Sequence, residues 1–181
     1  MIVIGASTGG TEALRELGYE NIAMDIVLDY ASDAQSNTFV LNELTFREAG
    51  MADLTLSLSV GNLNISEVDS VMENPFAITI NNAQLTYSDH SLMQRILEAT
   101  ARDEQTTVDQ LKQEALQELD MTFAQGIQQG DQVSIQALDA LKAFIMNPNK
   151  LSIVMAPAQP LPVAMFLGLS DPAQALQQLG I

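Results

Sequence analysis

Residues 53–60 read Asp-Leu-Thr-Leu-Ser-Leu-Ser-Val, a strict alternation of polar and apolar side chains. Because successive side chains of a β-strand point to opposite faces of the sheet, this segment predicts a strand with one apolar and one polar face. The segment Ile22–Tyr30 alternates in the same way, and Phe39–Phe46 does so less regularly. Short polar connections join the three segments. We therefore expect an antiparallel meander with one face in water.

Further strands are expected on the C-terminal side of this meander. Apolar residues alternate over Phe76–Ile80 and again over Ala83–Tyr87, but the phase changes at Asn81-Asn82. A β-bulge at this point would keep both halves on the same face of the sheet. Leu151–Met155 predicts a later strand, and the polar stretch before Phe76 predicts a single helical turn at Glu67–Met72.

Three amphipathic segments between residues 89 and 147 predict helices. Each is preceded by residues that commonly cap helix N-termini, namely Ser88 or Asp89, then Thr107, then Asp131 or Ser134. Thr107 and Gln110 form a capping box for the middle helix, whose apolar residues recur at spacings of three and four. Gly130 ends this helix, and Asn147-Pro148-Asn149 ends the third one.

The resulting fold class is α+β, with an antiparallel sheet (meander) of four to six strands covered on one face by two or three helices. We interpret residues 1–181 as a single α+β domain. Its parts are an N-terminal strand-turn-helix segment (1–18), a strand-rich part (19–88), a helical part (89–147), and a C-terminal part (148–181). The last part contains a strand, a Pro-rich loop and a short helix that Asp171-Pro172 starts and that runs over Pro172–Leu179.

The chain is strongly acidic, with a net charge of −16 from 23 Asp and Glu against 7 Lys and Arg. Such a field repels nucleic acid and anionic membrane surfaces and favours a basic partner. The absence of cysteine excludes disulfides, thiol catalysis and cysteine-based zinc sites. No signal peptide and no apolar run long enough to span a membrane are visible, which predicts a cytoplasmic protein as the sequence stands.

A glycine-rich motif lies at the N-terminus, where Ile4-Gly-Ala-Ser-Thr-Gly-Gly10 separates two apolar segments. The pattern predicts a strand over Ile2–Ile4, a turn over Gly5–Gly10, and a helix over Thr11–Leu17 that ends at Gly18. Glycines let such a turn bend sharply and expose the hydroxyl of Ser7.

Residues 2–16 resemble the nucleophile motif of the chemotaxis protein-glutamate methylesterases. The resemblance implies a doubly wound parallel sheet in which Ser7 attacks glutamyl methyl esters. A serine needs a base to become nucleophilic, and the only histidine of the chain is His90, so Ser7 and His90 form the candidate catalytic pair. The Gln-His-Met-Pro setting of the family's histidine and the glycine-rich setting of its aspartate do not occur in this sequence.

Other site chemistries are weaker matches. Gly5–Gly10 lacks the lysine of a phosphate-binding P-loop. Asn62–Glu73 has oxygen ligands at several EF-hand positions, but Glu67 replaces the required glycine and Asn62 replaces the first aspartate. We therefore predict no metal and no cofactor.

From Tyr19 onward, the order of strands, Gln-rich helices and a Pro-rich segment is similar to that of uncharacterised bacterial envelope proteins, which carry repeated strand-rich modules and an export signal. The resemblance implies that the chain is a fragment and periplasmic. We predict a non-catalytic binding or structural module of unknown partner, for which a protein is one option. The alternatives are a serine hydrolase of methylesterase type using Ser7 and an acidic inhibitor or nucleic-acid mimic. The strand over Asp53–Val60, if it lies at a sheet edge, would accept a partner strand.

Overall fold

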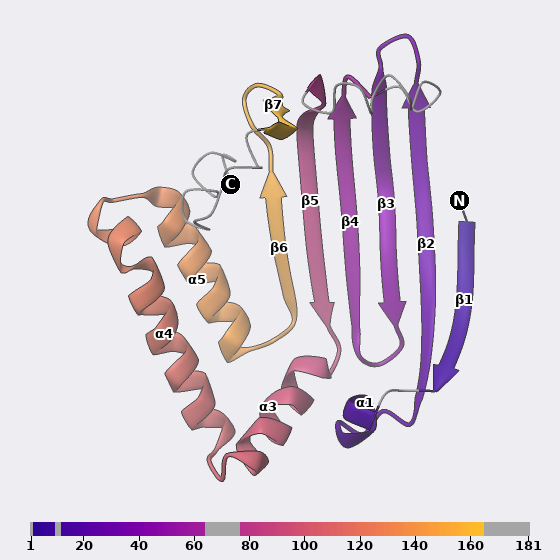
Figure 1. Cartoon of the computed structure of the whole chain (residues 1–181). Helices are drawn as coiled ribbons and strands as arrows, with labels where there is room; N and C mark the ends of the chain where they lie inside the picture. The colour runs from indigo at the N-terminus through magenta and orange to yellow at the C-terminus, as the bar shows by residue number, and fades with distance from the viewer. Residues whose placement is uncertain (1, 10–11, 64–76, 165–181) are drawn as a thin grey trace.

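The computed structural model describes residues 2–9, 12–63 and 77–164, and its strands form an antiparallel sheet in the order β1-β2-β3-β4-β5-β6 (Figure 1). Strands β1 to β5 each pair with the next strand along the chain, and β6 returns to pair with β5 after the helices. The bounds are β1 Ile2–Gly9, β2 Asn21–Asp33, β3 Thr38–Glu48, β4 Ala52–Gly61, β5 Thr79–Asp89, β6 Lys150–Met155 and a short β7 Leu161–Pro162 that also pairs with β5. The antiparallel meander is confirmed.

The expected β-bulge lies between β4 and β5. Ser59 pairs with Asn82, whereas the next residue, Val60, pairs with Ile80, so that Asn81 is the additional residue of β5. The bulge is therefore confirmed at the position where the apolar phase of the sequence changes. Its effect is to keep the apolar residues before and after Asn81 on one side of the sheet.

One side of the sheet, which we call the apolar face, carries aligned apolar side chains from five strands. Two rows of residues paired across β2 to β6 belong to it, namely Ile26, Phe46, Leu54, Tyr87 and Leu151, and then Leu28, Leu44, Leu56, Leu85 and Ile153. The opposite side, the polar face, has a central row of Val27, Thr45, Thr55, Thr86 and Ser152. The alternation in the sequence is thus preserved in these rows from β2 to β6.

The helices are α1 Glu12–Glu16, α3 Leu92–Asp103, α4 Val108–Gln128 and α5 Gln132–Met146. The capping box of Thr107 and Gln110 is formed, and Asp131 caps α5 by accepting hydrogen bonds from the backbone of Val133 and Ser134. These observations confirm the α+β class and the expected starts of the second and third long helices.

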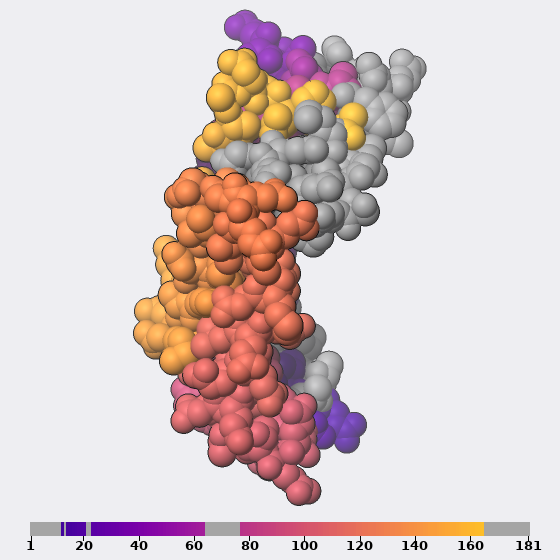
Figure 2. Space-filling view, turned by 90° about the vertical axis from the view of Figure 1, so that its left-hand side faces the viewer, coloured from indigo at the N-terminus to yellow at the C-terminus, as the bar shows by residue number. Residues whose placement is uncertain are grey.

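The helix α3 lies at the end of the sheet where the β3–β4 turn is, whereas α4 and α5 stand beside β6 and form the surface on that side of the molecule (Figures 1 and 2). The contact of α5 with the apolar face is near the β5–β6 end, where the rings of Phe144 and Tyr87 meet edge to face with centroids 5.7 Å apart. Elsewhere on this face large side chains keep much of their surface in water, with exposed fractions of 38% for Phe46 and 40% for Leu54. The sheet is therefore open over β3 and β4.

The N-terminal segment differs from its sequence expectation. The strand β1 continues through Gly9 and pairs antiparallel with β2, with Ser7 opposite Ala23, so the predicted turn over Gly5–Gly10 is wrong. Pairing with β2 supplies hydrogen-bond partners to the backbone along β1, and this outweighs the local turn preference of glycine. The end of α1 at Gly18 is confirmed, because this residue has the left-handed φ of 83°.

The position of β1 bears on the methylesterase resemblance. This strand lies at the margin of an antiparallel sheet, and every strand pair in the described part of the chain is antiparallel, whereas the resemblance implies a parallel sheet. The strand over Asp53–Val60 is also not at an edge, because β4 lies between β3 and β5. The helices predicted at Glu67–Met72 and Pro172–Leu179 lie outside the described residues.

Candidate functional site

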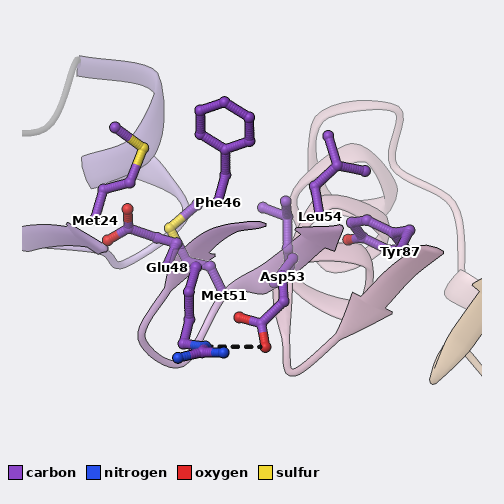
Figure 3. A pocket seen from close by; sticks show the side chains of 10 residues that line it. Met24, Phe46, Glu48, Met51, Asp53, Leu54 and Tyr87 are labelled. Carbon is purple, nitrogen blue, oxygen red and sulfur yellow. Dashed lines mark ion pairs between the residues drawn. The ribbon is translucent and has the colours of Figure 1, made fainter. Parts of the chain in front are cut away.

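A hollow of about 180 Å³ lies on the apolar face, where the β3–β4 turn meets the start of α3 (Figure 3). We call it the turn hollow. Its apolar lining comes from four strands, the β3–β4 turn and α3, and includes Met24, Phe46, Met51, Leu54, Tyr87 and Leu92. Two flexible thioethers and two aromatic rings among these residues suit an apolar group of variable shape.

The backbone holds the β3–β4 turn firmly against α3. The carbonyl of Met51 accepts hydrogen bonds from the amides of His90 at 2.8 Å, Ser91 at 3.1 Å and Leu92 at 3.3 Å. These amides belong to the N-terminal end of α3, where backbone donors lack partners within the helix. Gly50 lies within the β3–β4 turn and adopts a left-handed φ of 78°, which glycine accommodates without strain.

A charged cluster lies beside the hollow, on the other side of the strands. Arg47 and Asp53 are paired in register across β3 and β4, and Arg47 Nε lies 3.7 Å from Asp53 Oδ2. His90 Nε2 lies 3.3 Å from the same oxygen. Figure 3 shows Phe46 and Leu54 pointing to one side of the sheet and Asp53 to the other. The carboxylate thus orients the imidazole and can neutralise it when it is protonated.

The second carboxyl oxygen of Asp53, Oδ1, is buried and accepts no hydrogen bond from the described residues. A buried acceptor without a donor is uncommon in folded proteins. The Asp53 side chain therefore has capacity for one further donor, in addition to its contacts with Arg47 and His90.

Ser7 and His90 lie at the same end of the sheet but far apart across it. Ala6, which precedes Ser7, is in one row with Met24, Glu48, Ala52 and Asp89. Since neighbouring strands are about 4.8 Å apart, the four intervals from β1 to β5 amount to roughly 19 Å. A proton transfer needs heavy atoms at about 3 Å. The structure therefore does not bring the candidate catalytic pair together.

Asp89 connects β5 to α3. Its Oδ1 accepts hydrogen bonds from the Tyr87 hydroxyl at 2.7 Å and from the amide of Met93 at 2.9 Å. Asp89 thus satisfies an amide in the first turn of α3, but the N-cap of this helix is Ser91, so the predicted cap at Ser88 or Asp89 is wrong. Burial, assisted by the hydrogen bond to Asp89, raises the pKa of Tyr87 above its usual value, so this hydroxyl remains a neutral donor.

Sequence reasoning did not identify the partners of His90. The pattern around Asp53 shows only that this residue faces away from Leu54. The tight connection after Glu48 is a signal that places Arg47 opposite Asp53 in a hairpin, but the approach of His90 depends on the pairing of β4 with β5. That pairing joins segments separated by a long connection, for which the sequence offers no register signal.

Residues 2–9, 12–63 and 77–164 contain no group of three histidine or acidic side chains arranged to hold a metal ion. Most of the EF-hand-like segment, from residue 64 onward, lies outside these ranges. No helix within the same ranges is both long and apolar enough to cross a membrane.

A family model described as "Uncharacterized protein" matches residues 44–181 of the chain. The match begins within β3 and includes β4, β5, the three long helices and β6. The cluster of Arg47, Asp53 and His90 therefore lies inside it, as does the lining of the turn hollow except Met24. Searches of curated proteins and of solved structures found no match.

Proposed function

Since the chain belongs to the uncharacterised family whose model covers residues 44–181, we propose from its geometry that it is a non-catalytic binding module. In this proposal the apolar face of the sheet holds an apolar partner, and the turn hollow receives the part of the partner that enters most deeply. The proposal rests on the open face of the sheet.

The main support for the proposal is that large apolar side chains on this face are more than one-third exposed to solvent. The exposed fractions are 49% for Tyr30, 38% for Phe46, 40% for Leu54 and 38% for Leu85, and the pairing of β2 to β5 places these residues on one continuous surface. Full burial of such a side chain is worth about 1.5–3 kcal/mol, so covering the exposed part of each yields about 1 kcal/mol. A partner that covers all four gains about 4 kcal/mol before ordering costs.

The turn hollow supports the same proposal by its size and lining. Its volume of about 180 Å³ is comparable with cavities of roughly 150 Å³ that bind benzene. The side chains of Met24 and Met51 are unbranched and adapt to different shapes. The separation of β1 from His90 by four strand intervals favours this proposal over hydrolysis by the pair of Ser7 and His90.

Titration with the apolar dye bis-ANS tests the proposal. The folded wild-type protein is expected to bind the dye at the apolar face, and the double variant Phe46→Ser/Leu54→Ser is expected to lose at least about five-fold in affinity. Both replaced side chains are more than one-third exposed, so the fold should persist, which circular dichroism would verify. Thr55→Ser is the matched control, because Thr55 neighbours Leu54 in β4 but belongs to the polar face.

Two results would overturn the proposal. One is a folded wild-type protein whose dye binding is absent or is unchanged in Phe46→Ser/Leu54→Ser. The other is a molecular mass in solution of twice the chain mass that returns to the monomer value in this variant, because a second copy would then already cover the face.

A further inference from the structure

A second hollow lies at the β6 edge of the sheet, between β6 and the hairpin of α4 and α5. It is a groove of about 360 Å³, which we call the edge groove. Its helical wall includes Phe123 of α4 and the small or apolar residues Val133, Ala137 and Leu141 of α5. Its other wall is β6, including Ser152 and Val154. Figure 1 shows α5 and β6 close together at their connecting loop and diverging away from it.

The hydrogen-bond register shows which backbone groups of β6 face this groove. The amide of Asp89 donates to the carbonyl of Asn149 at 2.6 Å, one step beyond the paired residues Ser88 and Lys150. In an antiparallel pair, hydrogen-bonded and non-hydrogen-bonded positions alternate. The amides and carbonyls of residues 151 and 153 therefore point to β5, and those of Ser152 and Val154 point away from it.

The outward backbone groups of Ser152 and Val154 have no strand partner among the described residues, since β6 pairs only with β5 there. Val154 is 48% exposed, so the edge is accessible to solvent. An open strand edge is a template for pairing with another extended chain. The lining of the edge groove thus combines unpaired backbone donors and acceptors with an apolar helical wall.

We propose that the edge groove binds an extended segment of another protein, which adds to β6 as a further strand. A polypeptide fits this site better than a lipid chain, because only a backbone provides alternating donors and acceptors at the spacing of β6. The bound segment lies about 4.8 Å from β6, as neighbouring strands do. Its side chains directed toward α5 are apolar, and Ala137 and Ala140 leave room for them.

The negative charge of the chain favours a positively charged partner in the edge groove. The whole chain carries a net charge of −16, and the segment from Val108 to Met155 contains six Asp and Glu against three Lys. A second copy of this chain would bring the same negative charge and be repelled. A segment flanked by Lys or Arg is attracted and oriented instead. The proposed occupant is therefore an apolar strand with basic flanks.

The edge groove includes Leu151 and Ile153 of the apolar face, but it is distinct from the part of that face around Phe46 and Leu54. Val154 is paired with Gln84 on the polar face, and it does not line the turn hollow. A failure of strand addition at β6 would leave the dye binding of the apolar face unaffected, so the two proposals can be tested separately.

The test uses a fluorescein-labelled synthetic peptide, Lys-Lys-Val-Thr-Val-Thr-Val-Lys-Lys, and fluorescence anisotropy with the full chain at low salt. Val154→Pro removes an amide that points into the groove and adds a ring there, while the bonds between β5 and β6 remain. We expect at least about tenfold weaker binding than wild type, equivalent to about 1.4 kcal/mol. Val154→Ala, which keeps the amide, should bind within about threefold of wild type.

A second measurement does not depend on the folding of a variant. The same peptide with every valine and threonine N-methylated has no amide donors along its central segment and should fail to bind the wild-type protein. A version with Glu in place of Lys should also fail, and about 0.3 M salt should weaken the binding of the Lys peptide.

Four results would overturn the proposal. They are no binding of the Lys peptide to wild type, equal binding of the N-methylated or the Glu version, equal binding by folded Val154→Pro, and a wild-type dimer in sedimentation that Val154→Pro abolishes. The last result would show that a second copy, rather than a basic segment, occupies the groove.

Discussion

Replacement of Arg95 by methionine is expected to destabilise the protein, because this residue joins α3 to the segment between α1 and β2. Arg95 Nη1 donates a hydrogen bond to the carbonyl of Leu17 at 2.8 Å. Its guanidinium carbon lies 4.3 Å from the centre of the Tyr19 ring, an arrangement typical of a cation–π interaction. Methionine keeps most of the apolar stem and removes both polar interactions.

The expected loss follows from these two contacts. A hydrogen bond from a charged donor contributes about 1.5–3 kcal/mol, and a partly exposed cation–π contact about 0.5–1 kcal/mol. We therefore expect Arg95→Met to lower the free energy of unfolding by about 2–4 kcal/mol. With a urea m-value of about 2 kcal/mol/M for a chain of this size, the unfolding midpoint falls by about 1–2 M.

Urea unfolding followed by circular dichroism measures this change. Arg102→Met, at an exposed position in the last turn of the same helix, is the matched control and should change the midpoint little. Gly18→Ala offers a coupled test, because a Cβ at Gly18 would lie 2.7 Å from Arg95 Nη1. Its cost should be smaller in the Arg95→Met background than in wild type. Equal midpoints for Arg95→Met and Arg102→Met would refute the reasoning.

Three further predictions concern the sheet. Thr45 is 2% exposed and its hydroxyl contacts Glu43 Oε1 at 2.8 Å and Thr55 Oγ1 at 2.9 Å, so Thr45→Val should cost about 1–2 kcal/mol in chemical unfolding. The double variant Thr45→Val/Thr55→Val should lose less stability than the sum of the losses of the two single variants. A loss equal to that sum would contradict an energetic coupling between the two hydroxyls. Burial and the hydrogen bond to Asp89 raise the pKa of Tyr87 in the folded state. The Tyr87 hydroxyl therefore ionises at lower pH in the unfolded chain than in the folded protein, and the free energy of unfolding should fall as the pH rises above about 10. Tyr87→Phe should flatten this decline in melting temperatures measured between about pH 9 and 11. A fluorophosphonate probe should label wild type and Ser7→Ala equally, because β1 and β5 are four strands apart; labelling that requires Ser7 would instead support the hydrolase alternative.

The features predicted correctly are those that depend on a few neighbouring residues. The alternation of residues 53–60 predicts β4, and the phase change at Asn81-Asn82 predicts its bulge with β5. The capping box at Thr107 predicts the start of α4. Each of these signals lies within one turn or one strand, where side-chain direction and capping are determined by the local backbone.

The site required information from distant residues. Asp53 and His90 are on different elements, and their contact depends on the register of β4 against β5. The same applies to Ser7, whose glycine-rich surroundings favour a turn when considered alone. Pairing with β2 makes β1 an extended edge strand instead, and the resulting place of Ser7 relative to His90 follows from strand order.

The sequence by itself therefore determined the α+β class, the antiparallel strands with one apolar face, and the starts of α4 and α5, because these follow from short-range periodicity and capping. Only the tertiary structure decided that α5 packs near the β5–β6 end of the sheet and that the apolar face stays open around Phe46 and Leu54. It also decided that β1 and β6, rather than β4, are the edges of the sheet. The physical reason is that strand order and helix placement depend on contacts between residues far apart in the chain, whose energies no local pattern contains.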